Sequence, residues 1–205
     1  MVRHFRWMRS TLRALLATGC VAAPVSGQTA VQLTAGATSS GVLISDGVLH
    51  TKLQPAIAPT VGIALALPTG KGSYRVRLEA RYSRSTLKVT TTAGETDNLS
   101  SLATIDALVI AEGPLIGAVR WQAGGGALFY RPSDNQGVFL AGPTQRWQVM
   151  GGAIYSTPIT PQITLLINGR IDAHLFLTDV LRARNYAGSQ GVRRFSLQVG
   201  IERKV

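Results

Sequence analysis

Arginine, carboxylate and histidine residues stand at every second position of several apolar stretches in this chain. In residues 163–177, for example, the odd-numbered positions are apolar or glycine, and Arg170, Asp172 and His174 lie between them. Guanidinium and carboxylate groups pair through charge-assisted hydrogen bonds, which are often bidentate. A histidine near a carboxylate can also act as an acid–base group. The spacing therefore allows two kinds of chemistry, an internal ion-pair network or a catalytic site.

The catalytic interpretation finds few suitable residues. Beyond the N-terminal 27 residues the only histidines are His50 and His174. An enzyme that remodels lipid A needs a nucleophile and a base within reach of each other. No serine lies two positions from His174, where the His-x-Ser pattern of barrel deacylases would place it. We predict that His174 packs in the interior and that the chain is not an enzyme; a lipid A-modifying deacylase or acyltransferase that uses His174 or His50 is the alternative.

No metal or cofactor site is expected either. The two histidines are isolated, and Cys20, the only cysteine, lies in the N-terminal segment. The motif Gly70-Lys71-Gly72-Ser73 lacks the upstream spacing and the following helix of a phosphate-binding loop, and is more typical of a turn. The run Gly124-Gly125-Gly126 lies in an alternating stretch, where it would relieve crowding or permit curvature.

The first 27 residues have the order of a secretory signal peptide. A basic stretch with four arginines is followed by the apolar run 14–25 and by small residues up to Gly27. This order is typical of export signals, and the apolar run is far shorter than the roughly 20 residues of a transmembrane helix. We predict cleavage after Gly27 and one mature domain, residues 28–205. An amphipathic N-terminal helix and acylation of Cys20 are the alternatives.

The net charge of +11 falls to +7 once the signal is removed. Four of the 21 basic residues lie in the signal and none of the 10 acidic ones does, which leaves 17 basic against 10 acidic residues. The remaining arginines alternate with apolar residues and form no basic run. A nucleic-acid partner is therefore not expected. Anionic lipid head groups or internal ion pairs suit the pattern better.

Eight segments of the mature chain alternate between apolar and polar residues. This period of two predicts β-strands with one apolar face each. The strand predicted for residues 163–177 exceeds the usual five or six residues, and it suits a tilted strand across a bilayer, which needs about 9–11 residues. The predicted strands are residues 29–37, 56–67, 74–91, 102–112, 118–131, 146–156, 163–177 and 193–205.

The links between these strands alternate in length. Residues 68–73, 113–117 and 157–161 are short and contain the Gly and Pro that tight reversals require. The longer links predict loops that would carry any partner binding, at residues 39–55, 93–101, 132–145 and 178–191. Short turns at one end and long loops at the other are typical of an outer-membrane barrel. Lys52, Arg182 and Arg184 in these loops could contact lipid phosphates, although we expect them to be ordinary solvated charges.

Alternation alone does not say which face lies inside. A soluble barrel of the lipocalin type places apolar residues inside, whereas a membrane barrel places them against lipid around a polar interior. Small residues accompany the charges on the polar face, and an eight-stranded barrel is just wide enough for side chains to fill. We therefore predict a network of ion pairs in the lumen; a solvated outer face is the alternative. Its predicted members are Arg75, Arg77, Glu79, Arg81, Asp106, Glu112, Arg120, Arg146, Arg170, Asp172, His174 and Glu202.

Aromatic residues lie near the ends of the apolar faces. Such positions suit the girdles that membrane barrels carry at both interfaces, while burial in a soluble core is the alternative. The predicted interfacial aromatics are Trp121, Phe129, Trp147, Tyr155 and Phe195.

These features resemble the small outer-membrane β-barrel family that includes OmpX and the barrel domain of OmpA. Residues 61–68 followed by 74–83 resemble the second hairpin of many such barrels, and Gly200 with a terminal hydrophobic residue partly matches the family's assembly signal. Val205 stands where phenylalanine or tryptophan is common, and Arg203 where an aromatic is common. The resemblance covers the whole mature chain and lies in pattern, not in a diagnostic motif. It implies an all-β, eight-stranded antiparallel up-and-down transmembrane β-barrel, porin-like in architecture, in the outer membrane of a Gram-negative bacterium.

The sequence thus predicts a monomeric barrel with a structural or interaction role in the cell envelope. Membrane integrity, lipopolysaccharide contact and surface adhesion are the roles that this hypothesis includes. A filled lumen argues against a large diffusion pore. A narrow channel is the alternative within this hypothesis. The expected partners are outer-membrane lipids, lipopolysaccharide and, during insertion, the barrel-assembly machinery. The remaining alternatives are the lipid A-modifying enzyme and a soluble periplasmic ligand-binding barrel.

Overall fold

The structure, a computed structural model, describes residues 28–46, 51–70, 73–91, 93–134, 137–140, 142–183 and 190–205. The predicted signal peptide with Cys20 lies outside the described residues, as do His50 and Arg184. Among the described residues, no helix has the length and apolar character needed to cross a membrane.

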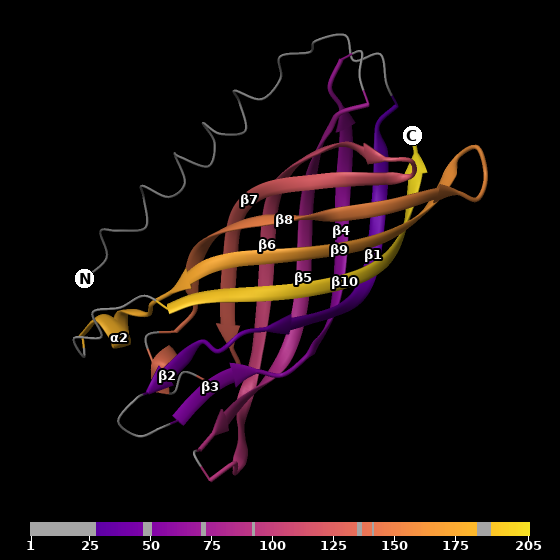
Figure 1. Cartoon of the computed structure of the whole chain (residues 1–205). Coiled ribbons are helices and arrows are strands. Elements are labelled where there is room, and N and C mark those ends of the chain that lie inside the picture. Colours follow the sequence, from indigo (N-terminus) through magenta and orange to yellow (C-terminus); the bar gives the residue numbers. More distant parts are fainter. Residues whose placement is uncertain are drawn as a thin grey trace.

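Eight long antiparallel strands close into a cylinder (Figure 1). Each pairs with its two neighbours, and β1 pairs with β10 from Ala30↔Lys204 to Ser40↔Arg194, which closes the ring. The prediction of an all-β, eight-stranded antiparallel up-and-down barrel is confirmed. The ring strands are β1 (Ala30–Ser40), β4 (Ala58–Pro68), β5 (Arg75–Thr90), β6 (Thr96–Ile116), β7 (Val119–Pro132), β8 (Thr144–Pro158), β9 (Ile163–Phe176) and β10 (Gln190–Lys204).

The two ends of the cylinder differ, as the lengths of the links predicted. At one end, the turn end, short links join β4 to β5, β6 to β7 and β8 to β9. The chain also ends here, where the backbone N–H of Val205 donates to the carbonyl of Thr29 at 2.9 Å. The opposite end, the loop end, carries three longer links, with the 3₁₀ helix η1 (Gly137–Phe139) and the short helix α2 (Asp179–Ala183), and one short link between β5 and β6.

Two of the four predicted loops consist mostly of strand. Within residues 39–55, β2 (Ile44–Asp46) and β3 (Thr51–Pro55) form a hairpin, and β3 continues the sheet beside β5. Strand β6 begins at Thr96 and so includes most of the predicted loop 93–101. The loop prediction was wrong at both places because β5 runs on to Thr90, where its backbone groups pair with Lys52 on one side and Thr96 on the other.

Side chains alternate between the two sides of the wall. On β5, Arg77 and Arg81 point inward and are 1% exposed, whereas Leu78 between them points outward and is 44% exposed. This is the reverse of a soluble lipocalin-type barrel, in which the apolar face lies inside. Charged side chains therefore lie in the lumen of this barrel, and the outer wall is apolar.

The glycine run on β7 allows this strand to approach β6 closely. A Cβ atom on Gly124 would lie 2.3 Å from the carbonyl oxygen of Val109, and one on Gly126 would lie 2.0 Å from that of Ala107. These separations are far below van der Waals contact, so only glycine fits. The run therefore permits the close pairing of β6 and β7 in a narrow barrel.

Candidate functional site

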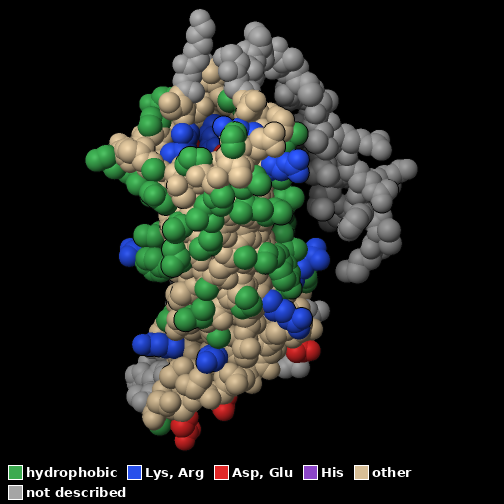
Figure 2. Space-filling view, turned by 90° about the vertical axis from the view of Figure 1, so that its right-hand side faces the viewer, with side chains coloured by type: hydrophobic (Ala, Val, Ile, Leu, Met, Phe, Trp, Pro, Cys, Tyr) green, Lys and Arg blue, Asp and Glu red, His purple; other side chains and the backbone are tan. Residues whose placement is uncertain are grey.

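The lumen begins at the turn end with a cluster around two glutamates. Arg75 on β5 donates through Nε to Glu112 on β6 and through Nη1 to Glu202 on β10 at 2.6 Å. Gln32 on β1 donates through Nε2 to the same Oε2 of Glu202 at 2.7 Å. Arg120 on β7 stands at the rim, with Nε 3.8 Å from Glu112, and donates to the carbonyl of Ser73. Lys and Arg side chains are visible inside the rim at the top of Figure 2, which is the turn end.

Arg77 forms the next layer of the lumen. Its guanidinium lies 2.5 Å from Glu112 and 3.2 Å from Glu79, and Nη2 donates to Gln122 at 2.7 Å. Gln122 in turn donates to Asn168 on β9. Side chains from β5, β6, β7 and β9 thus meet across the barrel, which is filled at this level.

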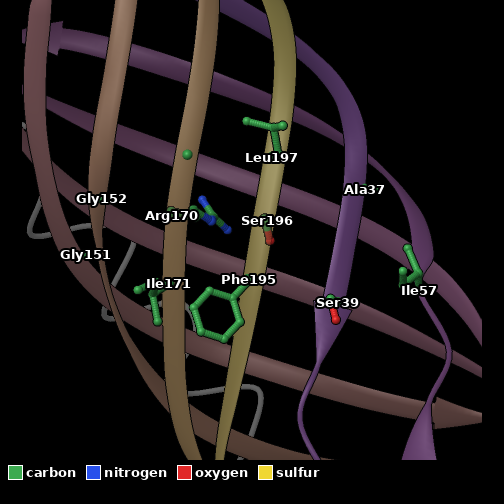
Figure 3. A pocket seen from close by; sticks show the side chains of 11 residues that line it. Ala37, Ser39, Ile57, Gly151, Gly152, Arg170, Ile171, Phe195, Ser196 and Leu197 are labelled. Atoms are coloured by element: carbon green, nitrogen blue, oxygen red, sulfur yellow. The ribbon is translucent and has the colours of Figure 1, made fainter.

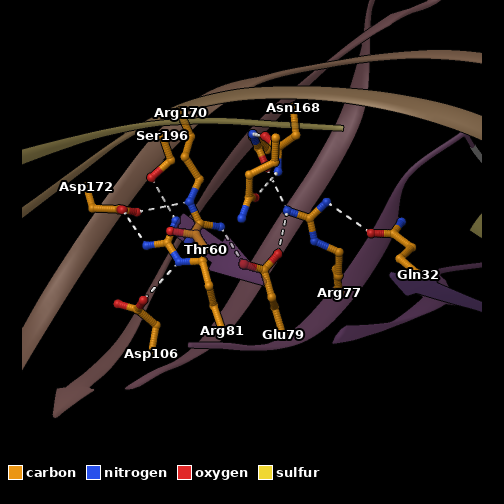
Figure 4. Close-up of polar contacts among 12 residues, drawn as sticks. Gln32, Thr60, Arg77, Glu79, Arg81, Asp106, Asn168, Arg170, Asp172 and Ser196 are labelled. Atoms are coloured by element: carbon orange, nitrogen blue, oxygen red, sulfur yellow. Dashed lines mark hydrogen bonds and ion pairs between the residues drawn. The ribbon is translucent and has the colours of Figure 1, made fainter. Parts of the chain in front are cut away.

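The middle of the lumen holds an alternating chain of charges (Figure 4). Arg170 on β9 lies 2.6 Å from Glu79 and 3.3 Å from Asp172. Arg81 on β5 lies 2.7 Å from the same Asp172 and 2.9 Å from Asp106 on β6. Each arginine bridges two carboxylates, so the positive and negative groups neutralise one another where little water reaches them.

Arg194 on β10 completes this chain and was not among the predicted residues. It is 2% exposed, and its Nη1 lies 2.8 Å from Asp106. Asp106 also accepts a hydrogen bond from Nε2 of Gln148 at 2.6 Å. The alternating pattern could have identified it, because Arg194 lies on the same face of the strand as the inward-facing Ser196 and Gln198.

An apolar cluster, which we call the cap, occupies the loop end of the lumen. The aromatic rings of Tyr130, Phe139 and Phe176 pack on one another, with Tyr130 and Phe176 edge to face at 5.4 Å between centroids. Residues of the links contribute as well as residues of the ring strands, since Phe139 comes from η1 and Leu181 from α2. The buried members are Leu43, Leu87, Leu102, Leu128, Tyr130, Phe139, Phe176, Leu181 and Val192. No residue of the cap was predicted as a site residue.

His174 lies at the boundary between the charged lumen and the cap. Its Nε2 is 2.7 Å from the hydroxyl of Tyr130, and its side chain is buried. Asp172, the carboxylate expected beside it, pairs instead with Arg81 and Arg170. The geometry therefore joins His174 to a cap residue and not to an acid. Among the described residues, no group of three or more His, Cys, Asp or Glu side chains is placed to hold a metal ion.

Arg146 is a predicted lumen residue that the structure does not bring into the network. It is half-buried, and its Nη1 donates to the carbonyl of the adjacent Gln145 at 2.9 Å. Its position is the second residue after the start of β8 at Thr144, at the loop end. The network carboxylates lie farther along the lumen, so the alternation placed Arg146 on the inner face but too close to the mouth.

The predicted aromatics lie on the outer wall. Trp147, Phe195 and Tyr155 are exposed, and Trp121 and Phe129 are half-buried among their neighbours. Trp121 packs against Tyr74 at 6.4 Å between ring centroids. In the space-filling view, hydrophobic side chains form a broad band over the visible wall (Figure 2).

The surface of this hydrophobic band is not equally high everywhere. On β8 and β9, Gly151 and Gly169 place no side chain on the wall. A shallow apolar groove results there, between larger side chains that include Ile171, Phe195 and Leu197 (Figure 3).

The fold is similar to solved outer-membrane barrels. Neisserial surface protein A (NspA) matches with a TM-score of 0.50 and 16% sequence identity over 86% of this chain and 97% of that one. The outer membrane protein OprG from Pseudomonas aeruginosa matches with a TM-score of 0.50 and 14% identity over 87% of this chain and 96% of that one. No protein-family model matches the chain, and no curated protein matches it in sequence. At these identities the likeness concerns the fold, and at that level it confirms the predicted resemblance to small outer-membrane barrels.

Proposed function

We propose that this protein resides in the bacterial outer membrane as a closed barrel with a structural or interaction role. The observation that carries the proposal is the contrast between wall and lumen: the apolar side chains face outward, and the lumen is filled with paired charges and then with the cap. An apolar wall exposed to water would be unstable, whereas against lipid it is the expected surface. On this assignment the turn end faces the periplasm and the loop end faces the exterior.

The filled lumen supports a barrel that is not a diffusion pore. Buried side chains occupy the lumen from Gln32 and Arg77 near the turn end, through Asp106 and Asp172, to Phe176 in the cap. An ion crossing the barrel would have to displace paired arginines as well as an apolar cluster. In planar bilayers, we therefore expect no steady large conductance from the folded protein. A stable open level in the range of general porins would contradict the closed barrel.

The location has its own test. Cell fractionation should place the protein in the outer membrane, and the folded barrel should migrate differently on SDS gels before and after boiling. A soluble periplasmic protein with one unchanging mobility would contradict the proposal. Location and conductance are measured independently, so a membrane protein that conducts would overturn only the closed lumen.

The position of His174 supports a non-enzymatic role over lipid A modification. The side chain is buried between the charged lumen and the cap, so a lipid outside the wall does not reach it. The matched test compares lipid A from cells that produce the wild type and the His174→Ala variant. We expect identical lipid A mass spectra; a modification that requires His174 would establish the enzyme instead.

A further inference from the structure

The outer faces of β5, β6 and β7 carry rows of chemically similar side chains. Register pairs outward-facing residues of adjacent strands into rows that run across the strands. Going toward the loop end, the rows change from small apolar to aromatic or aliphatic, then to basic, then to hydroxyl. The rows are Ala80–Ala107–Ala127, Tyr82–Ile105–Phe129, Arg84–Ala103–Arg131 and Thr86–Ser101.

The basic row places one arginine on each side of an alanine. Arg84 and Arg131 flank Ala103, so their Cα atoms are about 10 Å apart, two strand spacings. Ala103, which lies between them, has only a methyl side chain. Nη2 of the exposed Arg84 donates a hydrogen bond to Oγ of Ser101 at 3.0 Å, and Arg131 is exposed as well. In the described part of the chain, neither arginine forms an ion pair with a carboxylate.

The height of this row on the wall fits the head-group region of a membrane. Along β7, Trp121 near the turn end and Arg131 are ten residues apart, which corresponds to roughly 25 Å along the axis of a barrel with tilted strands. That distance matches the apolar band of a membrane barrel, about 25 Å tall and bounded by aromatic girdles. Arg84 and Arg131 therefore lie just beyond the aromatic edge of the band, at the loop end. Basic side chains are also visible below the hydrophobic band in Figure 2.

We propose that Arg84 and Arg131 form a phosphate clamp for a phosphorylated glycolipid of the outer leaflet. The guanidinium groups bind the phosphate through charge-assisted hydrogen bonds, and the acyl chains lie along the apolar rows beneath. Lys88 is the next outward basic residue on β5 and extends the positive surface toward the sugar. The inference rests on the proposed membrane location and deepens it by naming the lipid chemistry and the residues.

The test measures binding of purified lipid A to the folded, detergent-solubilised barrel by native mass spectrometry. The Arg84→Gln/Arg131→Gln double variant should bind lipid A about tenfold more weakly or worse, because two charged donors are lost. A lysine pair at the same positions should recover part of the affinity, since the charge remains without the bidentate geometry. Arg203→Gln is the matched control, because Arg203 is also outward and exposed but lies at the turn end.

Three results would overturn the clamp. Equal losses in the double variant and in Arg203→Gln would show unspecific charge attraction. Equal binding of lipid A from which the phosphates have been removed would show that phosphate is not recognised. Displacement of lipid A by inorganic phosphate at the same concentration would indicate a free-anion site. The heat-modifiable mobility of each variant shows that it is folded, and fractionation tests location separately, so a failed clamp is distinct from a failed location.

Discussion

Asp106 joins more strands than any other carboxylate described in the lumen. It lies 2.9 Å from Arg81 on β5 and 2.8 Å from Arg194 on β10, and it accepts from Gln148 on β8. Removal of the carboxylate by Asp106→Ala leaves Arg194 buried without a carboxylate partner among the described residues. Such a loss destabilises a folded protein by about 3–5 kcal/mol. We expect urea unfolding in phospholipid vesicles, followed by tryptophan fluorescence, to show a clearly lower midpoint.

Asp134 supplies the control for this prediction. Its carboxylate is exposed at the loop end and accepts a hydrogen bond from the neighbouring Ser133 at 2.9 Å. Replacement by alanine should change stability by no more than about 0.5 kcal/mol, as for most surface sites. Equal midpoints for the wild type and Asp106→Ala would mean that the ion pairs contribute little to the barrel.

At this scale the sequence predicts which side a residue faces better than which partner it meets. The period of two places Arg77, Arg81 and Arg170 inside, as the structure does. The pairing of Arg81 with Asp172, 91 positions away, depends on the stagger between strands that are not neighbours. Nothing in the local pattern encodes that stagger. The same limit explains why Asp172 was expected to lie beside His174.

The contact between β6 and β7 depends on glycine at two inward positions. Gly126→Ala would place a Cβ atom 2.0 Å from the carbonyl oxygen of Ala107, so the two strands would have to separate. Overpacking of this kind costs about 1–3 kcal/mol. Gly151→Ala on β8 is the control, because the nearest atom to its Cβ would be the Gln122 oxygen at 4.0 Å. We expect Gly126→Ala, and not Gly151→Ala, to reduce the folded, heat-modifiable band; equal bands would contradict the close approach.

The cap makes the loop end part of the packed structure. Phe176→Ala removes ring contacts with Tyr130 and Phe139, whose centroids lie 5.4 and 5.8 Å away. The loss of a buried phenylalanine costs about 3–5 kcal/mol. Because η1 and α2 pack on this cluster, the links at the loop end should also become more sensitive to added protease. Phe195→Ala, which removes an outward ring from the wall, should leave protease sensitivity unchanged; equal cleavage in both variants would argue against the cap.

The elements differ in how far the sequence predicts them. Long strands with an alternating pattern, such as β9, are found nearly to their ends because every residue repeats the same signal. The hairpin of β2 and β3 carries no such repeat, and it forms because the extended β5 offers unpaired backbone beside it. The cap combines Leu43, Phe139 and Leu181 from links without periodicity, so only tertiary packing brings them together.

For the molecule as a whole, the apolar outer wall and the polar lumen predict how deep each tryptophan lies in a membrane. Apart from the predicted signal peptide, the chain has two tryptophans, Trp121 near the turn end of β7 and Trp147 near the loop end of β8. Both lie on the outer wall near strand ends, so in a bilayer each should sit close to a head-group region. The side chain of Trp147 is 76% exposed and therefore open to lipid.

Single-tryptophan variants of the mature chain, made with Trp121→Phe or Trp147→Phe, separate the two sites. In vesicles of brominated phosphatidylcholine, bromine near the head group should quench each tryptophan more strongly than bromine near the chain ends. A barrel that was soluble or turned inside out would show no quenching by either lipid. Stronger quenching by the deep bromine would instead place the aromatic rows at mid-membrane. The basic row of Arg84 and Arg131 would then lie inside the hydrocarbon. Depth quenching therefore tests the orientation of the whole barrel together with the level at which a lipid phosphate could meet it.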